Sequence, residues 1–171
     1  DDDLFGGEPF DQIDGVFQQM RERPELRTHR ITNWLTPYLL RQHQKVVVTP
    51  CHGDLHFRIH VAEGSLSLFH TQHKMDMLVG GINNICQYAA LLMAAAQVLD
   101  LRADKLIFSI SDAHYYKMQK EMLQEVLSRE PRHFPTVYLT EKLTSVKDLR
   151  PHHFQIEDYH PHGDFRIPTP V

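Results

Sequence analysis

An alternating stretch in the first half of the chain constrains its fold more than any other feature. Apolar side chains occupy every second position from Leu55 to Val61, and polar side chains occupy the positions between them. This two-residue period is typical of a β-strand with one buried face. Glu63-Gly64-Ser65 has the composition of a turn, so residues 66–72 are expected to return as an antiparallel strand. The chain is therefore predicted to contain a hairpin.

Helical patterns lie on both sides of this hairpin. Residues 10–23 carry apolar side chains at helical spacing up to Pro24, and residues 82–99 are strongly apolar and rich in alanine. The second segment is expected to form a buried central helix. An amphipathic helix is predicted for residues 115–128. Short apolar runs predict further strands at residues 46–49, 106–110, 136–139 and 154–156.

The composition fits one globular domain. The 171 residues are enough for a single core, and the mixture of a hairpin with helices favours an α+β fold over regular βαβ alternation. We therefore expect one domain over residues 1–171, with a flexible start at residues 1–9. The formal net charge of −4 argues against a general nucleic-acid binder or a membrane-surface binder.

Cysteine usage and hydropathy bear on the compartment. Cys51 and Cys86 are too few for a disulfide framework, which favours a reducing environment. No apolar run is expected to reach the roughly 18 to 20 residues that span a bilayer. The acidic start Asp1-Asp2-Asp3 does not have the pattern of a signal peptide. We expect a soluble, cytoplasmic protein with no membrane partner.

Six short motifs follow one another along the chain and together resemble the pattern of the thymidylate synthase family. They are Pro50-Cys51-His52, Gln72–Asp76, Gly80 with Asn84-Ile85-x-x-Tyr88, Asp112-x-His114-x-Tyr116, Arg129–Pro135 and Phe154–His162. Their order and spacing hold from about residue 10 to residue 171, which makes the set far more specific than a lone Pro-Cys-His tripeptide. The resemblance implies a thymidylate synthase-like α+β fold, with a mixed sheet and a buried central helix.

The resemblance assigns the chemistry to Cys51 and Asn84. Cys51 would add to C6 of a uracil ring, so that C5 can attack the one-carbon unit of the co-substrate 5,10-methylenetetrahydrofolate. A cysteine does this only where its pKa is lowered from about 8.5, and the alternative is an inert structural cysteine. Asn84 would pair with O4 and N3–H of uracil because a carboxamide both donates and accepts. Relatives that act on cytosine carry an aspartate there, so the match favours a uracil nucleotide.

Further residues are assigned by the same resemblance. His114 and Tyr116 would hold the 3′-hydroxyl of the sugar, and the alternative is a loop pair satisfied by backbone. Asp76 would hydrogen-bond the pterin ring of the folate beside Gly80, and the alternative is a helix or turn cap. Asn83 is expected to be a helix-start residue. Cys86 is expected to be a small packed residue of the apolar helix.

Departures from the family pattern concern phosphate binding. The family's Gln-Arg-Ser, whose arginine and serine hold the phosphate, is Gln72-His73-Lys74 here. Lys74 can act as a point charge but not as a bidentate partner. The family's paired arginines cross a twofold interface into the partner's site. In this chain they correspond to Arg27 and Thr28, and Arg30 is expected to replace the arginine that is missing at Thr28. Because these residues act across an interface in the family, the resemblance implies a homodimer.

The portion that precedes these motifs in the family has no counterpart in this chain. That portion normally supplies a glutamate that manages proton transfers through water. We expect either a fragment of a longer protein or a trimmed relative. Two alternatives to a methyl-transferring enzyme therefore stay open: a pyrimidine nucleotide 5-hydroxymethylase of the same family, and a non-catalytic relative that acts as a binding module.

The 13 histidines raise the question of a metal site. His52, His56 and His60 are expected on one face of a strand, with His70 and His73 on the next strand. Residues four apart on a strand are separated by about 13 Å, too far to bind one zinc ion. We therefore expect no metal site.

Overall fold

The computed structural model describes residues 10–35, 39, 49–164 and 166–169. Its helices are α1 (Gln12–Glu22), α3 (Ile82–Val98) and α4 (Lys120–Ser128). Its strands are β1 (Arg30–Thr32), β2 (His52–His60), β3 (Ser65–Asp76), β4 (Arg102–His114), β5 (Thr136–Leu139) and β6 (Phe154–Glu157). Short helical turns are η1 (Val61–Glu63), η2 (Met77–Gly81), η3 (Lys117–Gln119), η4 (Val146–Asp148) and η5 (Pro151–His153). The architecture is α+β, as the sequence predicts.

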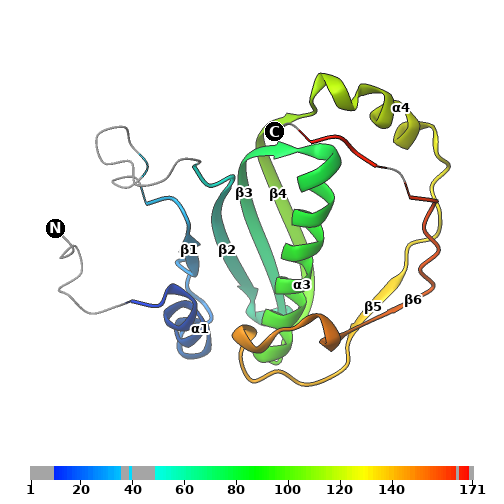
Figure 1. Cartoon of the computed structure of the whole chain (residues 1–171). Coiled ribbons are helices and arrows are strands. Elements are labelled where there is room, and N and C mark those ends of the chain that lie inside the picture. Colours follow the sequence, from blue (N-terminus) through cyan, green and yellow to red (C-terminus); the bar gives the residue numbers. More distant parts are fainter. Residues whose placement is uncertain (1–9, 36–38, 40–48, 165, 170–171) are drawn as a thin grey trace.

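The main sheet has four described strands in the order β1-β2-β3-β4 (Figure 1). β1, β2 and β3 pair antiparallel, whereas β3 and β4 pair parallel, so the sheet is mixed. The predicted hairpin is confirmed, with Phe57 opposite Leu68. The alternation ends earlier than expected, because Val61 lies in η1 with 60% of its surface exposed. Gly64 then closes the turn at a φ of 57°, which favours glycine.

α3 covers one face of this sheet (Figure 1). Its Tyr88 and Leu92 pack into a core with Phe57, Leu66 and Leu68. The prediction of a buried central helix therefore holds for one face of the helix. The opposite face is exposed in the described chain, at Ile82, Ile85 and Cys86. The expectation that Cys86 is packed is wrong for this structure.

The apolar helix also corrects the expectation about chain hydropathy. The helical stretch Met77–Val98 is 22 residues long, and its length and composition would allow it to cross a membrane. The core helix of a soluble protein can have the same composition, and α3 contributes buried side chains to the core beside the sheet. The stretch is thus weak evidence for a membrane span.

A bulge near the start of β2 changes which histidines share a face. His52 lies opposite Gln72 and Leu55 lies opposite His70, so β2 carries one extra residue between these pairs. His52 and His70 therefore lie on the face that packs against α3, whereas His56 lies on the other face. The predicted grouping of His52, His56 and His60 on one face is wrong. In the described part of the chain, no group of three or more His, Cys, Asp or Glu side chains could hold a metal ion.

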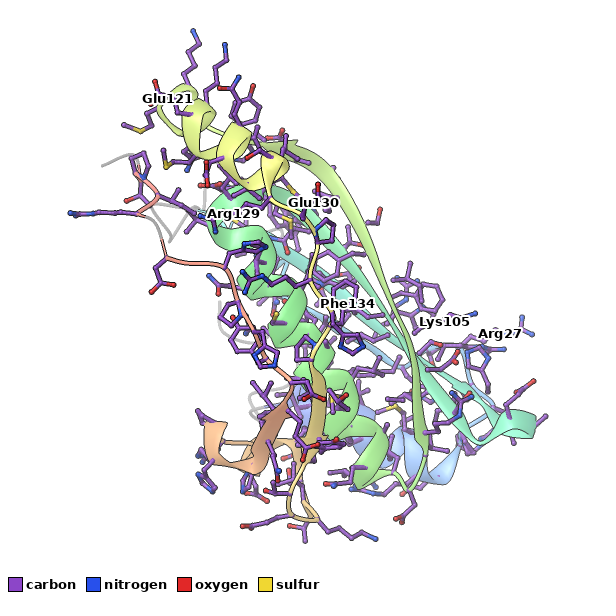
Figure 2. All side chains as sticks on the ribbon, turned by 90° about the vertical axis from the view of Figure 1, so that its right-hand side faces the viewer. Arg27, Lys105, Glu121, Arg129, Glu130 and Phe134 are labelled. Carbon is purple, nitrogen blue, oxygen red and sulfur yellow. The ribbon has the colours of Figure 1, made fainter. Side chains whose placement is uncertain are left out.

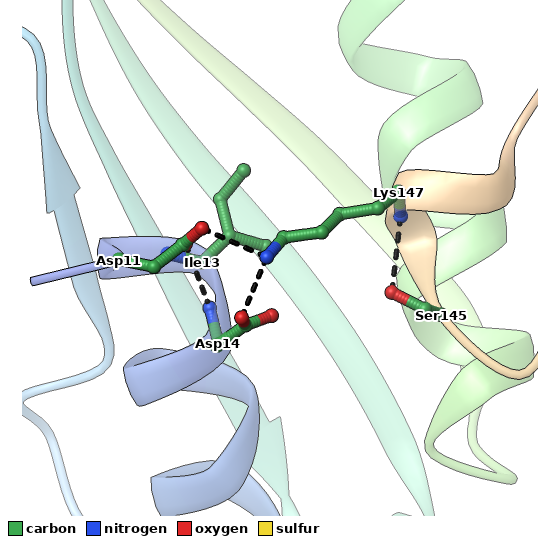
Figure 3. Close-up of polar contacts among 5 residues, drawn as sticks. All are labelled: Asp11, Ile13, Asp14, Ser145 and Lys147. Carbon is green, nitrogen blue, oxygen red and sulfur yellow. Dashed lines mark hydrogen bonds and ion pairs between the residues drawn. The ribbon is translucent and has the colours of Figure 1, made fainter.

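α1 is fixed to the segment that follows β5 by two ion pairs. Lys147 Nζ lies 2.8 Å from Asp11 Oδ2 and 2.6 Å from Asp14 Oδ2, and Asp11 also caps the helix (Figure 3). The hydrogen bonds to both carboxylates raise the pKa of Lys147, and the bond from Lys147 lowers the pKa of Asp11. These contacts hold Phe17 of α1 edge-on against Phe57 of the sheet, at 5.8 Å between ring centroids.

The remaining elements differ from expectation mainly in their ends. The strand predicted at residues 106–110 is longer, as β4, and the helix predicted at residues 115–128 begins only at Lys120, after η3. The late strands at residues 136–139 and 154–156 are confirmed as β5 and β6, which form a separate two-stranded sheet. The strand predicted at residues 46–49 lies mostly outside the described residues.

Buried histidines predict a loss of stability in mild acid. Burial lowers the pKa of His29, His56 and His70. The unfolded chain, with histidine pKa values of about 6.5, therefore binds more protons than the folded chain below that pH. The free energy of unfolding should therefore be highest above about pH 6.5 and should decrease as the pH falls below that value. Urea titrations at about pH 5.5 and about pH 7.5 measure the difference. His70→Gln should reduce the difference, whereas exposed His133→Gln should not.

Candidate functional site

Several motif residues meet at one end of the main sheet. β3 and β4 run parallel and end together, so that Asp76 lies beside His114. β2 runs antiparallel to β3 and begins at the same end, with His52 beside Gln72. α3 starts there as well, directly after η2. The topology thus gathers the motifs that the sequence separates.

Cys51 lies half-buried in the bend that precedes β2. Its carbonyl oxygen accepts a hydrogen bond from the amide of His73 at 2.8 Å, so β3 fixes the backbone of the cysteine. The Nζ of Lys74 donates to Thr49 Oγ1 at 3.3 Å. The ammonium group of Lys74 is therefore held at Thr49, two residues before Cys51 in the chain.

His73 is held in contact with an aromatic side chain and beside a glycine. Its ring packs against Trp34, with 4.5 Å between ring centroids, and its Nε2 lies directly above Gly53. This Nε2 is buried and has no hydrogen-bond partner among the described residues. Adjacent side chains on a strand point to opposite faces, so His73 faces away from Gln72 and Lys74.

Gln72 belongs to a buried polar network behind the cysteine. It is fully buried, its Oε1 lies 2.8 Å from His70 Nε2, and its Nε2 donates to the carbonyl of Lys74 at 3.0 Å. The His70 ring stacks on Tyr88 at 3.9 Å between centroids. The Tyr88 hydroxyl lies 2.8 Å from Nδ1 of His52. Burial raises the pKa of Tyr88 to about 12, so the phenol stays protonated and can donate to His52.

The sequence interpretation missed His70 and Tyr88 as members of this network. The sequence assigns Tyr88 only to the Asn-Ile-x-x-Tyr motif. His70 could have been found, because it is polar at a position where the strand pattern requires an inward side chain. Both residues hold the start of β2 against α3, directly beside Cys51.

Asp76 caps the turn that leads into α3. Its Oδ1 accepts from the amides of Leu78 at 3.1 Å and Val79 at 3.3 Å, at the start of the π-helical turn η2. This is the cap that the sequence left open as an alternative, and it leaves Oδ2 turned toward the rest of the site. Turns of this type are frequent at functional sites.

Asn84 lies half-buried on the first turn of α3, above Gly80. A Cβ at Gly80 would lie 3.8 Å from Asn84 Nδ2. Among the described residues, the Asn84 amide has no hydrogen-bond partner, so its donors and acceptor are open to a ligand. Asn83 instead donates to the carbonyl of Val79 at 2.9 Å, as expected of a helix-start residue.

His114, the last residue of β4, and Tyr116, two residues after it, lie together at the end of the strand. Their rings meet edge-to-face at 5.4 Å between centroids, and His114 Nδ1 lies 3.3 Å from Asp112 Oδ2. The amide of Tyr116 donates to Gln119 Oε1 at 2.9 Å, and Gln119 Nε2 donates to Asp76 Oδ2 at 3.0 Å. Sequence reasoning missed Gln119, which joins the sugar-binding and folate-binding candidates.

A cavity of about 770 Å³ is lined by η2, the start of α3, the segment that follows α4 and residues near the end of the chain. Leu78 and Ile82 line it from η2 and α3, and Ile167 lines it from the end of the chain. Arg129 donates to the carbonyl of Gly163 at 3.0 Å, and Figure 2 shows Arg129 near the end of α4. Cys51 does not line this cavity, so its volume does not define the candidate site.

Arg27 and Arg30 lie away from Cys51. Arg30 is exposed on β1, with Nη1 3.8 Å from Asp54 Oδ2. Arg27 is exposed in the preceding loop, and Figure 2 shows it on the side of the molecule remote from α4. β1 is antiparallel to β2, so the chain before β1 leads away from the end where β2 begins. Within one chain, these arginines are not brought to the cysteine.

Comparison with known proteins gives the family. The family model described as thymidylate synthase matches residues 5–171. The chain belongs to the thymidylate synthase family. A thymidylate synthase from Rhizobium rhizogenes (strain K84 / ATCC BAA-868) is 33% identical to it over 164 residues, which cover 92% of this chain and 52% of the relative. The chain thus spans about half the length of the curated relative it matches.

Gly53 provides a test of how closely this family site is packed. A Cβ at residue 53 would lie 2.7 Å from the carbonyl oxygen of Thr71 and 2.9 Å from His73 Nε2. Gly53→Ala should therefore push β2 away from β3 beside Cys51 and reduce the free energy of unfolding by about 1–3 kcal/mol. Chemical denaturation measures this change. Gly163→Ala is the control, because no atom lies within 4 Å of its added Cβ; equal losses in the two variants would contradict the packing argument.

Proposed function

We propose that this chain carries the nucleotide-modifying centre of a thymidylate synthase, which transfers a one-carbon unit to C5 of deoxyuridylate and yields thymidylate. The observation that carries the proposal is the meeting of Cys51, Asn84, Asp76 and His114 at one end of the sheet, in a chain of this family. A nucleophile, an amide for the base and a group for the sugar are the parts that such a reaction needs.

Cys51 begins the reaction in this proposal. Its thiolate adds to C6 of the uracil ring, and the electron pair of the C5–C6 bond moves toward C5 and O4. Asn84 donates to O4 and accepts from N3–H, so it stabilises the negative charge that develops on O4. Elimination of the Cys51 sulfur from C6 later restores the ring and the free thiolate.

The folate is the co-substrate, and the described residues offer it one matched contact. 5,10-Methylenetetrahydrofolate supplies the one-carbon unit and the hydride that converts it to a methyl group. Asp76 Oδ2 accepts one hydrogen bond, from Gln119, and has capacity for a second from an N–H group of the pterin. Gly80 has no side chain and so leaves the Nδ2 of Asn84 uncovered on that side, where an added Cβ would lie 3.8 Å from it.

We further propose a cytoplasmic homodimer that pairs through the sheet face opposite α3. Phe69 on this face is 41% exposed, although it belongs to a central strand. Arg27 and Arg30 lie on the same edge of the molecule, far from their own Cys51, as residues handed to a partner's site would. Lys74 would supply a point charge to the nucleotide phosphate within its own site.

A non-catalytic binding module is the second candidate, and His73 is the observation that favours it. Its ring is held between Trp34 and Gly53 instead of beside Lys74. The phosphate side of the site therefore offers less positive charge than the family pattern. A 5-hydroxymethylase shares Cys51 and Asn84, and the mass of the product distinguishes a methyl from a hydroxymethyl group.

Covalent trapping tests the role of Cys51. Incubation with 5-fluoro-2′-deoxyuridylate and methylenetetrahydrofolate should add the mass of both molecules to the peptide that contains Cys51, because fluorine at C5 cannot leave as a cation. Cys51→Ala should abolish the adduct, measured by mass spectrometry. Cys86→Ala is the control, because Cys86 lies exposed on α3 and should leave labelling intact. An adduct that persists in Cys51→Ala would exclude the mechanism.

Base selection tests the role of Asn84. Cytosine has an amino group at position 4 and no proton on N3, so both contacts with the amide are mismatched. Two mismatched hydrogen bonds in a dry site correspond to about 2–6 kcal/mol of preference for deoxyuridylate over deoxycytidylate. Asn84→Asp should reduce or reverse this preference in calorimetric titrations. Asn83→Asp is the matched control, since Asn83 bonds the backbone of η2; equal affinities of the unmodified protein for both nucleotides would refute the assignment.

A further inference from the structure

Gln119 lies where three segments from distant parts of the chain meet. Its side chain is fully buried. Nε2 donates to Asp76 Oδ2 at 3.0 Å and to the carbonyl of Pro168 at 3.2 Å, and Oε1 accepts from the amide of Tyr116 at 2.9 Å. A carboxamide has two N–H donors and one carbonyl oxygen. These contacts use both donors and the oxygen, so they allow one orientation of the amide.

We propose that Gln119 is a positioning residue that ties the C-terminal tail to Asp76. The C-terminal tail is defined here as residues 158–164 and 166–169. Because the same amide holds Pro168 and Asp76, closure of the tail and orientation of the carboxylate are coupled. The identification of a pterin as the ligand of Asp76 rests on the proposed function, whereas the tie itself does not.

The hydrogen bonds of Asp76 show why Gln119 matters for recognition. Oδ1 is occupied by two backbone amides, from Leu78 and Val79. A carboxylate has about four acceptor positions, and Gln119 takes a third. The remaining position is on Oδ2, and its direction is set by the bond from Gln119. Asp76 therefore accepts a hydrogen bond from a ligand donor that approaches Oδ2 from one direction only.

The rest of the tail is held by different residues. Arg129 donates to the carbonyl of Gly163 at 3.0 Å, and Arg132 donates to the carbonyls of His160 at 3.0 Å and Pro161 at 2.7 Å. Gln119 holds the tail beyond these anchors, at Pro168. Loss of Gln119 should therefore free the residues near Pro168 selectively and leave the earlier part of the tail in place.

Trypsin cleavage after Arg166 measures this release. A protease cleaves a segment that is extended and released from its contacts, so the cleavage rate measures local opening of the tail. In Gln119→Glu and Gln119→Met, the peptide of residues 167–171 should be released about tenfold faster than in the unmodified protein, as expected for the loss of a buried hydrogen bond. Gln124→Met is the matched control, because Gln124 is exposed on α4. Cleavage after exposed Lys142 should stay constant and exclude global unfolding.

Steady-state kinetics separate positioning of the folate from positioning of the nucleotide. Gln119→Glu keeps an acceptor for the amide of Tyr116 but loses the donors to Asp76 and Pro168. At pH 8 it should raise the KM for methylenetetrahydrofolate about tenfold and the KM for deoxyuridylate less than about twofold. Gln119→Met should raise both.

Each possible result decides one part of the proposal. Unchanged release of residues 167–171 in both Gln119 variants would overturn the tie between the tail and Asp76. Equal increases of the two KM values in Gln119→Glu would overturn the folate-specific role. An unmodified protein that neither turns over nor forms the trapped adduct would overturn the proposed function, and the cleavage rates would still decide whether Gln119 holds the tail.

Discussion

The pairing of β3 with two different neighbours is the constraint on which the rest of the structure depends. β2 joins β3 antiparallel through a short turn, but β4 joins it parallel, which requires a long crossover. α3 supplies that crossover, and its apolar face closes the core over the sheet. Because a parallel partner starts and ends at the same edge, Asp76 and His114 emerge side by side. The candidate site is thus a direct result of the direction of β4.

A buried polar network adds rigidity where the core meets this site. His70, Gln72 and Tyr88 replace apolar contacts with hydrogen bonds and a ring stack, directly behind the start of β2. A fully satisfied network fixes side-chain orientation more strictly than apolar packing does, but an unpaired member would cost free energy. The Nε2 of His70 lies 2.8 Å from Gln72 Oε1 and its Nδ1 lies 3.2 Å from the carbonyl oxygen of Asp54; both oxygens are acceptors, so the neutral ring donates to one of them at a time. Burial in this network lowers the pKa of His70. The same network positions His52 and Cys51.

Sequence reasoning recovered what depends on local pattern and missed what depends on distant contacts. The hairpin followed from alternation, but the bulge between His52 and Leu55 leaves no periodic signal, so the histidine faces were assigned wrongly. Residues 82–99 are apolar on nearly all sides, so their period could not show which face is buried, and Cys86 was placed in the core. Gln119 has a polar side chain in an amphipathic segment, where exposure is the ordinary expectation. Its partners Asp76 and Pro168 lie 43 and 49 residues away in the sequence.

Under the proposed function, the altered phosphate motif changes which part of a nucleotide dominates recognition. A bidentate arginine would give two charge-assisted hydrogen bonds to a phosphate, whereas Lys74 gives one flexible point charge that already bonds Thr49. An exposed ion pair contributes about 0–1 kcal/mol. Two matched hydrogen bonds from a half-buried amide such as Asn84 contribute more, because the competing base leaves buried donors and acceptors unpaired. In the proposed homodimer, selectivity would therefore come from the base edge, and phosphate affinity would depend on Arg27 and Arg30 of the second chain.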